Sequence, residues 1–196
     1  MRSLTYYVAV TLDGYIAAPD GSFGFFPIEP DVTEAMLPEY PETVPVQGRT
    51  ALGLEDVPNR RFDTVLMGWG TYLPALGEGI TSPYPHLEQY VFSRTRTGTD
   101  PSVRVTAEDP VTVVRELKRR EGDLGIWLCG GGKLAAALRP EIDELVIKRN
   151  PIVLGSGIPM FDGPFEPLRF TPVATRAFGS GVSVTRYTRA GADVDG

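Results

Sequence analysis

Two segments of the chain join an apolar strand to a helix through a turn that contains glycine. They are residues 65–76 (VLMGWGTYLPAL) and residues 126–138 (IWLCGGGKLAAAL). A strand that ends in glycine and opens a helix exposes backbone N–H groups at the positive end of the helix dipole, where a phosphate binds favourably. A tight turn without a ligand would explain either segment alone. Two of them in one chain predict a ligand that is held at more than one point along a polyphosphate, such as a dinucleotide.

The rest of the chain alternates predicted strands and helices. Strands are expected at residues 4–12, 62–67, 88–93, 124–129 and 144–152, and helices at residues 30–40, from residue 72, from residue 110 and at residues 133–138. Asp109 and Pro110 are residue types preferred just before a helix and at its first position. Residues 170–178 and 182–189 indicate two strands joined by a glycine-containing turn. We therefore predict an α/β fold in three layers, with a mixed, mostly parallel central sheet, helices on both faces and a C-terminal antiparallel hairpin.

The length and the distribution of turn residues predict the domain organisation. A chain of 196 residues can form one domain with one substantial core, so we expect a single domain over residues 1–196. Residues 21–61 are rich in proline, glycine and aromatic residues, and a loop-rich region of this size is usually functional. We expect it to form the substrate-side wall, where Phe23, Phe25 and Phe26 either stack on a flat heterocycle or pack on the core. Residues 190–196 are expected to form a flexible tail.

Charge and residue counts argue against several classes of function. The net charge of −6 and the isoelectric point near 4.9 argue against nucleic acid or a membrane as a partner, because both require a basic surface. Cys129 is the only cysteine and His86 the only histidine. We therefore expect no disulfide within the chain, no metal site and a reducing, cytoplasmic location. His86 follows no serine elbow and is expected in a surface loop. Neither a leader peptide nor a membrane-spanning run is expected.

Five motifs, taken in order, resemble those of a known family. They are residues 11–17 (TLDGYIA), 65–72 (VLMGWGTY), 91–95 (VFSRT), 129–132 (CGGG) and 151–161 (PIVLGSGIPMF). The chain resembles the dihydrofolate reductase superfamily, in the branch that contains the reductase domain of bacterial riboflavin biosynthesis and its stand-alone relatives. The resemblance covers residues 4–187 apart from residues 21–61, and it implies a dihydrofolate-reductase-like form of the predicted fold.

The resemblance also implies an NADPH site. Its expected members are Ala9, Ile16 and Ala17 at the nicotinamide, Gly68, Trp69, Gly70 and Thr71 at one phosphate-binding helix start, Cys129, Gly130, Gly131, Gly132, Lys133 and Leu134 at the other, and Ser93, Arg94 and Thr95 at the ribose 2′-phosphate. A 2′-phosphate needs hydroxyl or guanidinium donors, which implies NADPH over NADH. The family commonly has arginine where this chain has Trp69, an indole that can stack on adenine but cannot neutralise a phosphate. The preference for NADPH then rests on Arg94 and Arg96.

The implied reaction is hydride transfer from the nicotinamide to an electrophilic carbon of a small, heterocyclic substrate. The resemblance places this chemistry in a reductase related to 5-amino-6-(5-phosphoribosylamino)uracil reductase. Asp13 is the candidate for a polar contact with the substrate, and Asp31 either assists protonation or caps a helix. Two alternatives stay open, namely a true dihydrofolate or pterin reductase and a catalytically silent nucleotide-binding protein. Relatives frequently form homodimers, so a homodimer is a further expectation.

Overall fold

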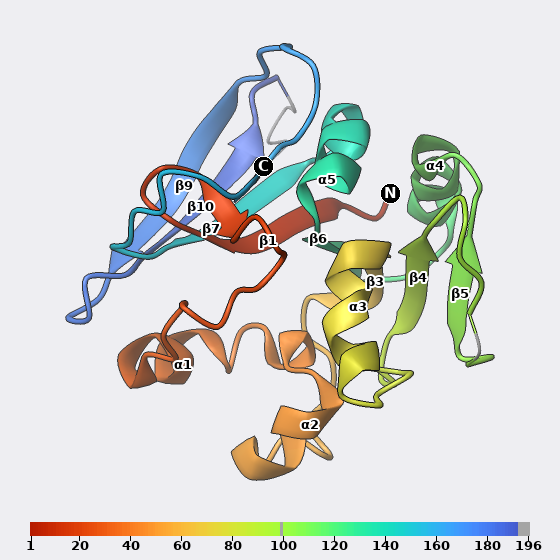
Figure 1. Ribbon diagram of the computed structural model, residues 1–196, viewed down its shortest axis with the longest axis horizontal. Coiled ribbons are helices and arrows are strands. Elements are labelled where there is room, and N and C mark those ends of the chain that lie inside the picture. The colour runs from red at the N-terminus through yellow and green to blue at the C-terminus, as the bar shows by residue number, and fades with distance from the viewer. Residues whose placement is uncertain (99, 192–196) are drawn as a thin grey trace.

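An eight-stranded sheet runs through the molecule. The computed structural model describes residues 1–98 and 100–191, so the predicted flexible tail lies outside the described residues from residue 192 onward. The strands are β1 (Leu4–Val10), β3 (Phe62–Gly68), β4 (Glu88–Phe92), β5 (Val103–Thr106), β6 (Gly125–Gly130), β7 (Glu144–Arg149), β9 (Phe170–Ala177) and β10 (Ser183–Arg189). Their order is β5-β4-β3-β6-β1-β7-β10-β9, with β5 and β9 at opposite ends (Figure 1). All neighbours from β5 to β7 pair in parallel, whereas β10 is antiparallel to β7 and β9. The predicted sheet and its C-terminal hairpin are confirmed.

Helices cover both faces of this sheet, because successive side chains of a strand point to opposite faces and both sets are apolar. One core lies against α4 (Pro110–Arg119) and α5 (Gly132–Leu138), and Leu117 is buried there. The other core includes Val32 of α1 (Pro30–Met36) and Tyr72 of α3 (Trp69–Gly77). The side chain of Asp109 accepts the Thr112 N–H at the start of α4, as its residue type predicts. Within residues 1–98 and 100–191, no helix is both long enough and apolar enough to span a membrane.

Several elements differ from the predicted ones. α1 ends at Met36 rather than at residue 40, because Pro38 has no backbone N–H with which to continue the helical hydrogen bonds. The sequence pattern also misses β5 and two short strands, β2 (Tyr15–Ala17) and β8 (Ile158–Pro159). β2 and β8 pair antiparallel as a second, two-stranded sheet. Strands of two to four residues are too short to show a period in the sequence.

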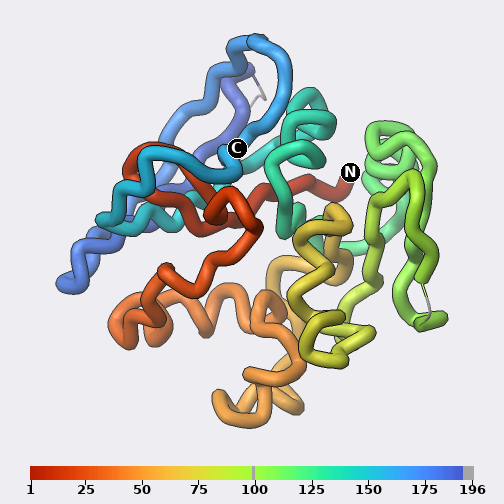
Figure 2. Tube along the Cα trace, viewed as in Figure 1, coloured from red at the N-terminus to blue at the C-terminus, as the bar shows by residue number. Residues whose placement is uncertain are grey.

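Residues 21–61 form the orange segment along the lower part of the molecule in Figure 2. They contain short helical turns, η1 (Pro41–Thr43), α2 (Val46–Arg49) and η2 (Thr50–Leu52). The fully buried Glu42 carboxylate accepts the backbone N–H groups of residues 60–62 at 2.7–3.2 Å. His86 Nε2 lies 2.8 Å from the Glu42 carbonyl oxygen, and the ring is half-buried. His86 does lie in a loop, as expected, but it is half-buried rather than fully at the surface, and it helps to anchor this region to the rest of the fold.

Candidate active site

The two glycine turns meet at one edge of the sheet. β3 and β6 are parallel neighbours, so their carboxyl ends lie side by side, and Gly68 and Gly131 precede the helices that follow them. A Cβ atom added at Gly68 would lie 3.5 Å from the Gly131 nitrogen, and one added at Gly130 would lie 3.3 Å from Thr71 Oγ1. Gly130 also has a φ of +147°, a conformation that favours glycine. Two turns that are far apart in the sequence thus form one continuous backbone surface.

Gly70 and Gly132 occupy different surroundings within this surface. A Cβ atom at Gly70 would meet nothing within 4 Å, so the space beside it is open. A Cβ atom at Gly132 would lie 2.2 Å from the Pro159 carbonyl oxygen, and the Gly132 oxygen accepts the Asp162 N–H at 3.0 Å. The crossing of residues 158–162 over the start of α5 therefore requires glycine at position 132, whether or not a ligand binds there.

The residues on either side of the second glycine turn are Cys129, Lys133 and Leu134, and they differ in burial. The Leu134 side chain is buried in the core, whereas Lys133 is exposed. Leu134 can therefore meet a ligand only through its backbone N–H, which has no intrahelical partner in the first turn of a helix. Burial raises the pKa of the Cys129 thiol to about 12. Cys129 is thus a neutral, packed thiol beside the turn.

The residues predicted at the nicotinamide lie at the same edge. Ala9 is near the carboxyl end of β1, which is the neighbour of β6 in the sheet. Ile16 Cδ1 lies 4.0 Å from the position that a Cβ atom would take at Gly131. Ala17 is buried where β2 pairs with β8. The structure thus brings Ile16 next to the second glycine turn.

The residues predicted at the ribose phosphate follow β4. Ser93 Oγ accepts the backbone N–H groups of Thr95 and Arg96 at 3.4 and 3.0 Å, which shapes this turn. The guanidinium carbon of Arg96 lies 5.9 Å from the centroid of the Trp69 ring, a cation–π contact. Arg94 and Arg96 are exposed, and neither side chain forms an ion pair within the described part of the chain. Arg96 therefore brings a guanidinium to the Trp69 indole.

The Asp13 carboxylate holds two loops together. It accepts the Thr11 hydroxyl at 2.6 Å and the backbone N–H groups of Leu154 and Gly155, the latter at 2.7 Å. These hydrogen bonds, led by that of Thr11, lower the pKa of Asp13 below its usual value. Asp13 is thus an exposed, ionised group that positions the loop between β7 and β8.

The Asp31 carboxylate joins α1 to the turn between β9 and β10. It accepts the Ser180 N–H at 3.1 Å and the Val32 N–H at 2.8 Å. The hydrogen bond from Ser180 is the main cause of a pKa below the usual value. An ionised carboxylate with engaged oxygens is poorly suited to donate a proton. The helix-cap alternative is wrong as well, because Glu29 is the N-cap of α1 and Asp31 is its second residue. Asp31 instead ties α1 to the distant turn.

Phe23, Phe25 and Phe26 are not part of either core. The Phe25 and Phe26 rings are in contact, with centroids 4.6 Å apart, and Phe23 is 53% exposed. The alternative that these rings pack on the core is therefore not what the structure shows. Whether they contact a substrate stays a prediction.

Sequence reasoning missed Lys148, which lies on β7, and Asn150, which directly follows that strand. Lys148 is directly paired with Ala9 of β1 and with Val184 of β10, so the three side chains share a face of the sheet. Asn150 is fully buried, and its Nδ2 group donates to the carbonyl oxygens of Val10 and Lys148 at 3.4 and 3.3 Å. The sequence contained a signal for Lys148, because successive side chains of a strand alternate between its two faces. This alternation places Lys148 on the same face of β7 as the buried Val146.

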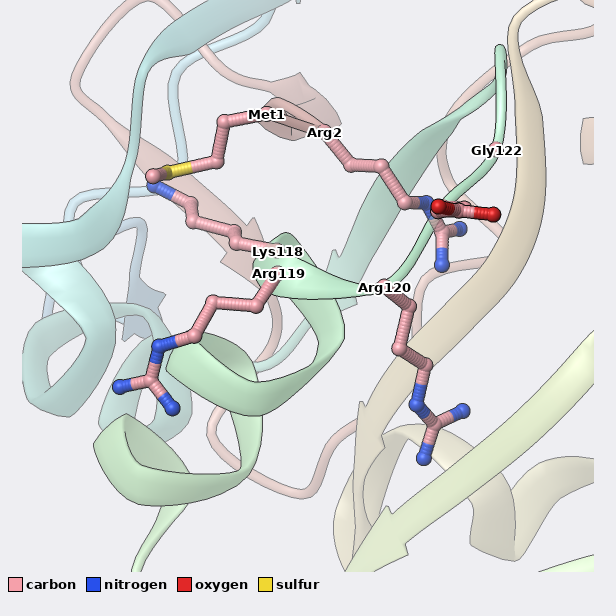
Figure 3. Close-up of a pocket in the computed structure, with 7 residues that line it drawn as sticks. Met1, Arg2, Lys118, Arg119, Arg120 and Gly122 are labelled. Carbon is pink, nitrogen blue, oxygen red and sulfur yellow. The ribbon is translucent and has the colours of Figure 1, made fainter.

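Two cavities lie away from this edge of the sheet. One, of about 350 Å³, is lined by Met1, Arg2, residues 118–121 and Gly122 (Figure 3). Its buried cations are paired, since Arg2 contacts Asp63 and the Lys118 ammonium lies 2.7 Å from Asp143. The other, of about 180 Å³, includes Ser3, Thr5 and Phe62. Both open at the amino ends of β1, β3 and β6, opposite to the glycine turns, so neither is part of the candidate site.

Comparisons with known proteins identify the family of the chain. The sequence model of the RibD C-terminal domain matches residues 2–184. The protein named Uncharacterized protein YwjB from Bacillus subtilis (strain 168) is 32% identical over 96% of this chain and 99% of its own length.

Solved structures show the same fold. A structure from Shewanella sp. PV-4, provisionally named as a riboflavin biosynthesis protein, has a TM-score of 0.68 and 24% identity, over 95% of this chain and 98% of its own. A diaminohydroxyphosphoribosylaminopyrimidine deaminase/5-amino-6-(5-phosphoribosylamino)uracil reductase from Thermotoga maritima has a TM-score of 0.63 and 16% identity, over 96% of this chain and 56% of its own. Dihydrofolate reductase from Enterococcus faecalis complexed with NADP(H) has a TM-score of 0.61 and 16% identity, over 96% of each chain. The predicted dihydrofolate-reductase-like fold is confirmed.

Proposed function

This chain belongs to the RibD C-terminal domain family, and from that membership we propose that it is a reductase that uses NADPH to reduce a small heterocyclic substrate. Two of the similar structures bear names that support this proposal. The Thermotoga maritima protein is named as a 5-amino-6-(5-phosphoribosylamino)uracil reductase, and the Enterococcus faecalis enzyme is complexed with NADP(H). We therefore propose hydride transfer as the reaction class, with a substrate related to such heterocycles.

The observation that carries the proposal is the contact between the two glycine turns. Gly68 and Gly131 lie side by side at the starts of two helices, and Gly70 has open space beside its α-carbon. Helix starts have unpaired N–H groups, and closely approaching glycines let a phosphate reach them. A pyrophosphate with its two negative groups fits this cradle better than a single phosphate does, because two helix starts converge on it.

The chain's own residues would hold NADPH along this edge. Residues 68–71 and 130–131 would donate backbone N–H groups to the pyrophosphate, and Arg94 and Arg96 would bind the 2′-phosphate. The Trp69 indole, with Arg96 above it, would stack on the adenine. Bound NADPH supplies the hydride, and the wall that Ala9 and Ile16 contribute would orient the nicotinamide.

The substrate would lie between this edge and residues 21–61. The exposed Phe23 ring is available to stack on a flat heterocycle, since it belongs to neither core. Asp13 would act by holding residues 154–155 beside the site, because its oxygens already accept their N–H groups. This assigns Asp13 a positioning role in place of the direct polar contact with the substrate that its sequence position suggested.

We also propose that two copies of the chain associate and that the protein works in the reducing cytoplasm. β9 is an edge strand that is exposed along nearly its whole length, and Val173 on it is 47% exposed. An exposed edge strand is a ready template for pairing with another chain. The lone Cys129 is consistent with a reducing compartment. Light scattering on the purified protein tests the dimer, because a monomer at micromolar concentration contradicts it.

Calorimetric titration of the full chain with NADPH, and in parallel with NADH at the same salt concentration, tests the cofactor. We expect micromolar binding of NADPH and binding of NADH that is weaker by about tenfold, or about 1.4 kcal/mol. Gly70→Leu should weaken NADPH binding at least about tenfold, because its side chain would fill the open space where the phosphate approaches. Gly77→Leu is the matched control, since Gly77 lies at the other end of α3 and also has nothing within 4 Å.

The outcomes separate the competing functions. If the wild-type chain binds neither cofactor, the reductase proposal fails. Binding of NADPH without turnover of any member of a heterocycle panel favours the catalytically silent alternative. Turnover of dihydrofolate that antifolates inhibit favours the dihydrofolate reductase alternative.

A further inference from the structure

Lys148 brings an uncompensated positive charge to the wall that Ala9 forms. Lys148 is paired with Ala9 in the parallel register of β1 and β7, so their side chains project from the same face of the sheet at neighbouring positions. The residue is half-buried, and its ammonium forms neither a hydrogen bond nor an ion pair with any residue in 1–98 or 100–191. The ammonium is not among the buried polar atoms without a partner in the described residues, so it reaches solvent. A cation on this wall that no described residue pairs with is available to act on a ligand bound there.

The charged and titratable groups around Lys148 do not neutralise it by contact. On the same face lie Tyr7 of β1 and Arg186 of β10, and Glu29 and Asp31 lie at the start of α1. Burial lowers the pKa of Lys148 and the Glu29 carboxylate opposes this shift, although Glu29 is not within ion-pair distance. Asp31 is engaged with the turn between β9 and β10.

The two redox forms of a nicotinamide differ by one positive charge on the ring. The reduced dihydronicotinamide ring is neutral, whereas the oxidised ring is cationic. An ammonium on the wall beside the ring repels the oxidised form and leaves the reduced form almost unaffected. We propose that Lys148 makes this site prefer NADPH to NADP⁺. The inference rests on the proposed function, which places the nicotinamide against Ala9, and its consequence is faster release of the oxidised cofactor after hydride transfer.

The ratio of two dissociation constants measures this effect without a known substrate. Titration of the full chain at pH 7 and low salt gives Kd for NADP⁺ and Kd for NADPH, and low salt limits screening. Lys148→Met should lower the ratio of Kd(NADP⁺) to Kd(NADPH) by about tenfold, mainly through tighter binding of NADP⁺. Arg149→Met is the matched control, because it removes the same charge from an exposed residue on the other face of β7. The control should leave the ratio unchanged.

If the Lys148→Met variant does not fold, the Lys148→Arg variant and a pH titration of the wild type test the same proposal. Lys148→Arg keeps the charge, so it should keep the wild-type ratio. When the pH rises from 7 through the lowered pKa of Lys148, the wild-type amine becomes neutral and NADP⁺ should bind more tightly, whereas the Lys148→Arg protein should show no such gain.

Each result decides one question. A ratio that Lys148→Met leaves unchanged, or that falls equally in Arg149→Met, overturns the role of Lys148 while the proposed function stands. A pH response that is the same in wild type and Lys148→Arg overturns it as well. Absence of binding of either cofactor to the wild-type chain overturns the proposed function itself.

Discussion

Gly132→Ala is expected to destabilise the fold more than it affects ligand binding. The new methyl group would lie 2.2 Å from the Pro159 carbonyl oxygen, so residues 158–162 must shift by about 1 Å to restore an ordinary contact. Overpacking of this kind costs about 1–3 kcal/mol, and the hydrogen bond from the Asp162 N–H to the Gly132 oxygen adds about 1 kcal/mol if it is lost. We therefore expect the free energy of unfolding to fall by about 2–4 kcal/mol.

Urea denaturation measures this loss, and NADPH titration of the folded variant measures binding. Gly77→Ala in α3 serves as the control, because a methyl group there meets nothing within 4 Å and alanine favours a helix by up to about 1 kcal/mol over glycine. An unchanged free energy of unfolding together with a large loss of NADPH affinity would refute this reasoning. It would mean that position 132 needs glycine for the approach of a ligand rather than for the crossing of residues 158–162.

Three further predictions concern stability, pH and cofactor choice. Glu42→Ala should lower the free energy of unfolding by about 3 kcal/mol in urea denaturation, because three backbone N–H groups lose their buried acceptor. Glu42→Gln keeps one acceptor oxygen and should lower the free energy of unfolding less. Equal losses in the two variants would contradict this account. The hydrogen bond from Ser180 depresses the folded-state pKa of Asp31, so its contribution is present above the unfolded-state pKa of about 4 and is lost as the pH falls through the folded-state value. Denaturation between pH 5 and about pH 2 should therefore show a shallower loss of stability for Asp31→Asn than for wild type, and parallel curves would count against it. Arg96→Met should weaken NADPH binding about tenfold and NADH binding little in parallel titrations, and equal weakening of both would argue against a contact with the 2′-phosphate.

Local residue chemistry predicted most of the secondary structure. Asp109 followed by Pro110 marked the start of α4, because a side-chain acceptor and a residue without N–H both suit that position. The glycine turns predicted where β3 and β6 end, since the chain reverses direction there with little steric hindrance. Apolar runs of strand length, alternating with helical segments, predicted a mostly parallel sheet, and that class of fold is confirmed.

Interactions between segments that are distant in the sequence could not be predicted from local residue chemistry. β2 and β8 each have too few residues to form a recognisable period, and they exist because they pair with each other. The half-burial of His86 was not predicted, because its partners, Glu42 and Arg49, are far away in the sequence. For Asp13 a contact with the substrate was expected, and for Asp31 either protonation or a helix cap, yet each carboxylate also accepts N–H groups from the distant C-terminal part of the chain, Leu154 and Gly155 for Asp13 and Ser180 for Asp31.

The sequence by itself determined where the longer strands, most of the longer helices and the glycine turns form, because these depend on steric and hydrogen-bonding preferences within a few residues. Only the tertiary structure decided that β3 lies beside β6, and hence that a Cβ atom at Gly68 would meet Gly131. It also decided that Lys148 stands next to Ala9, a pairing set by the register of β7 on β1. Register depends on which apolar faces are buried together across the whole sheet, and no local pattern contains that information.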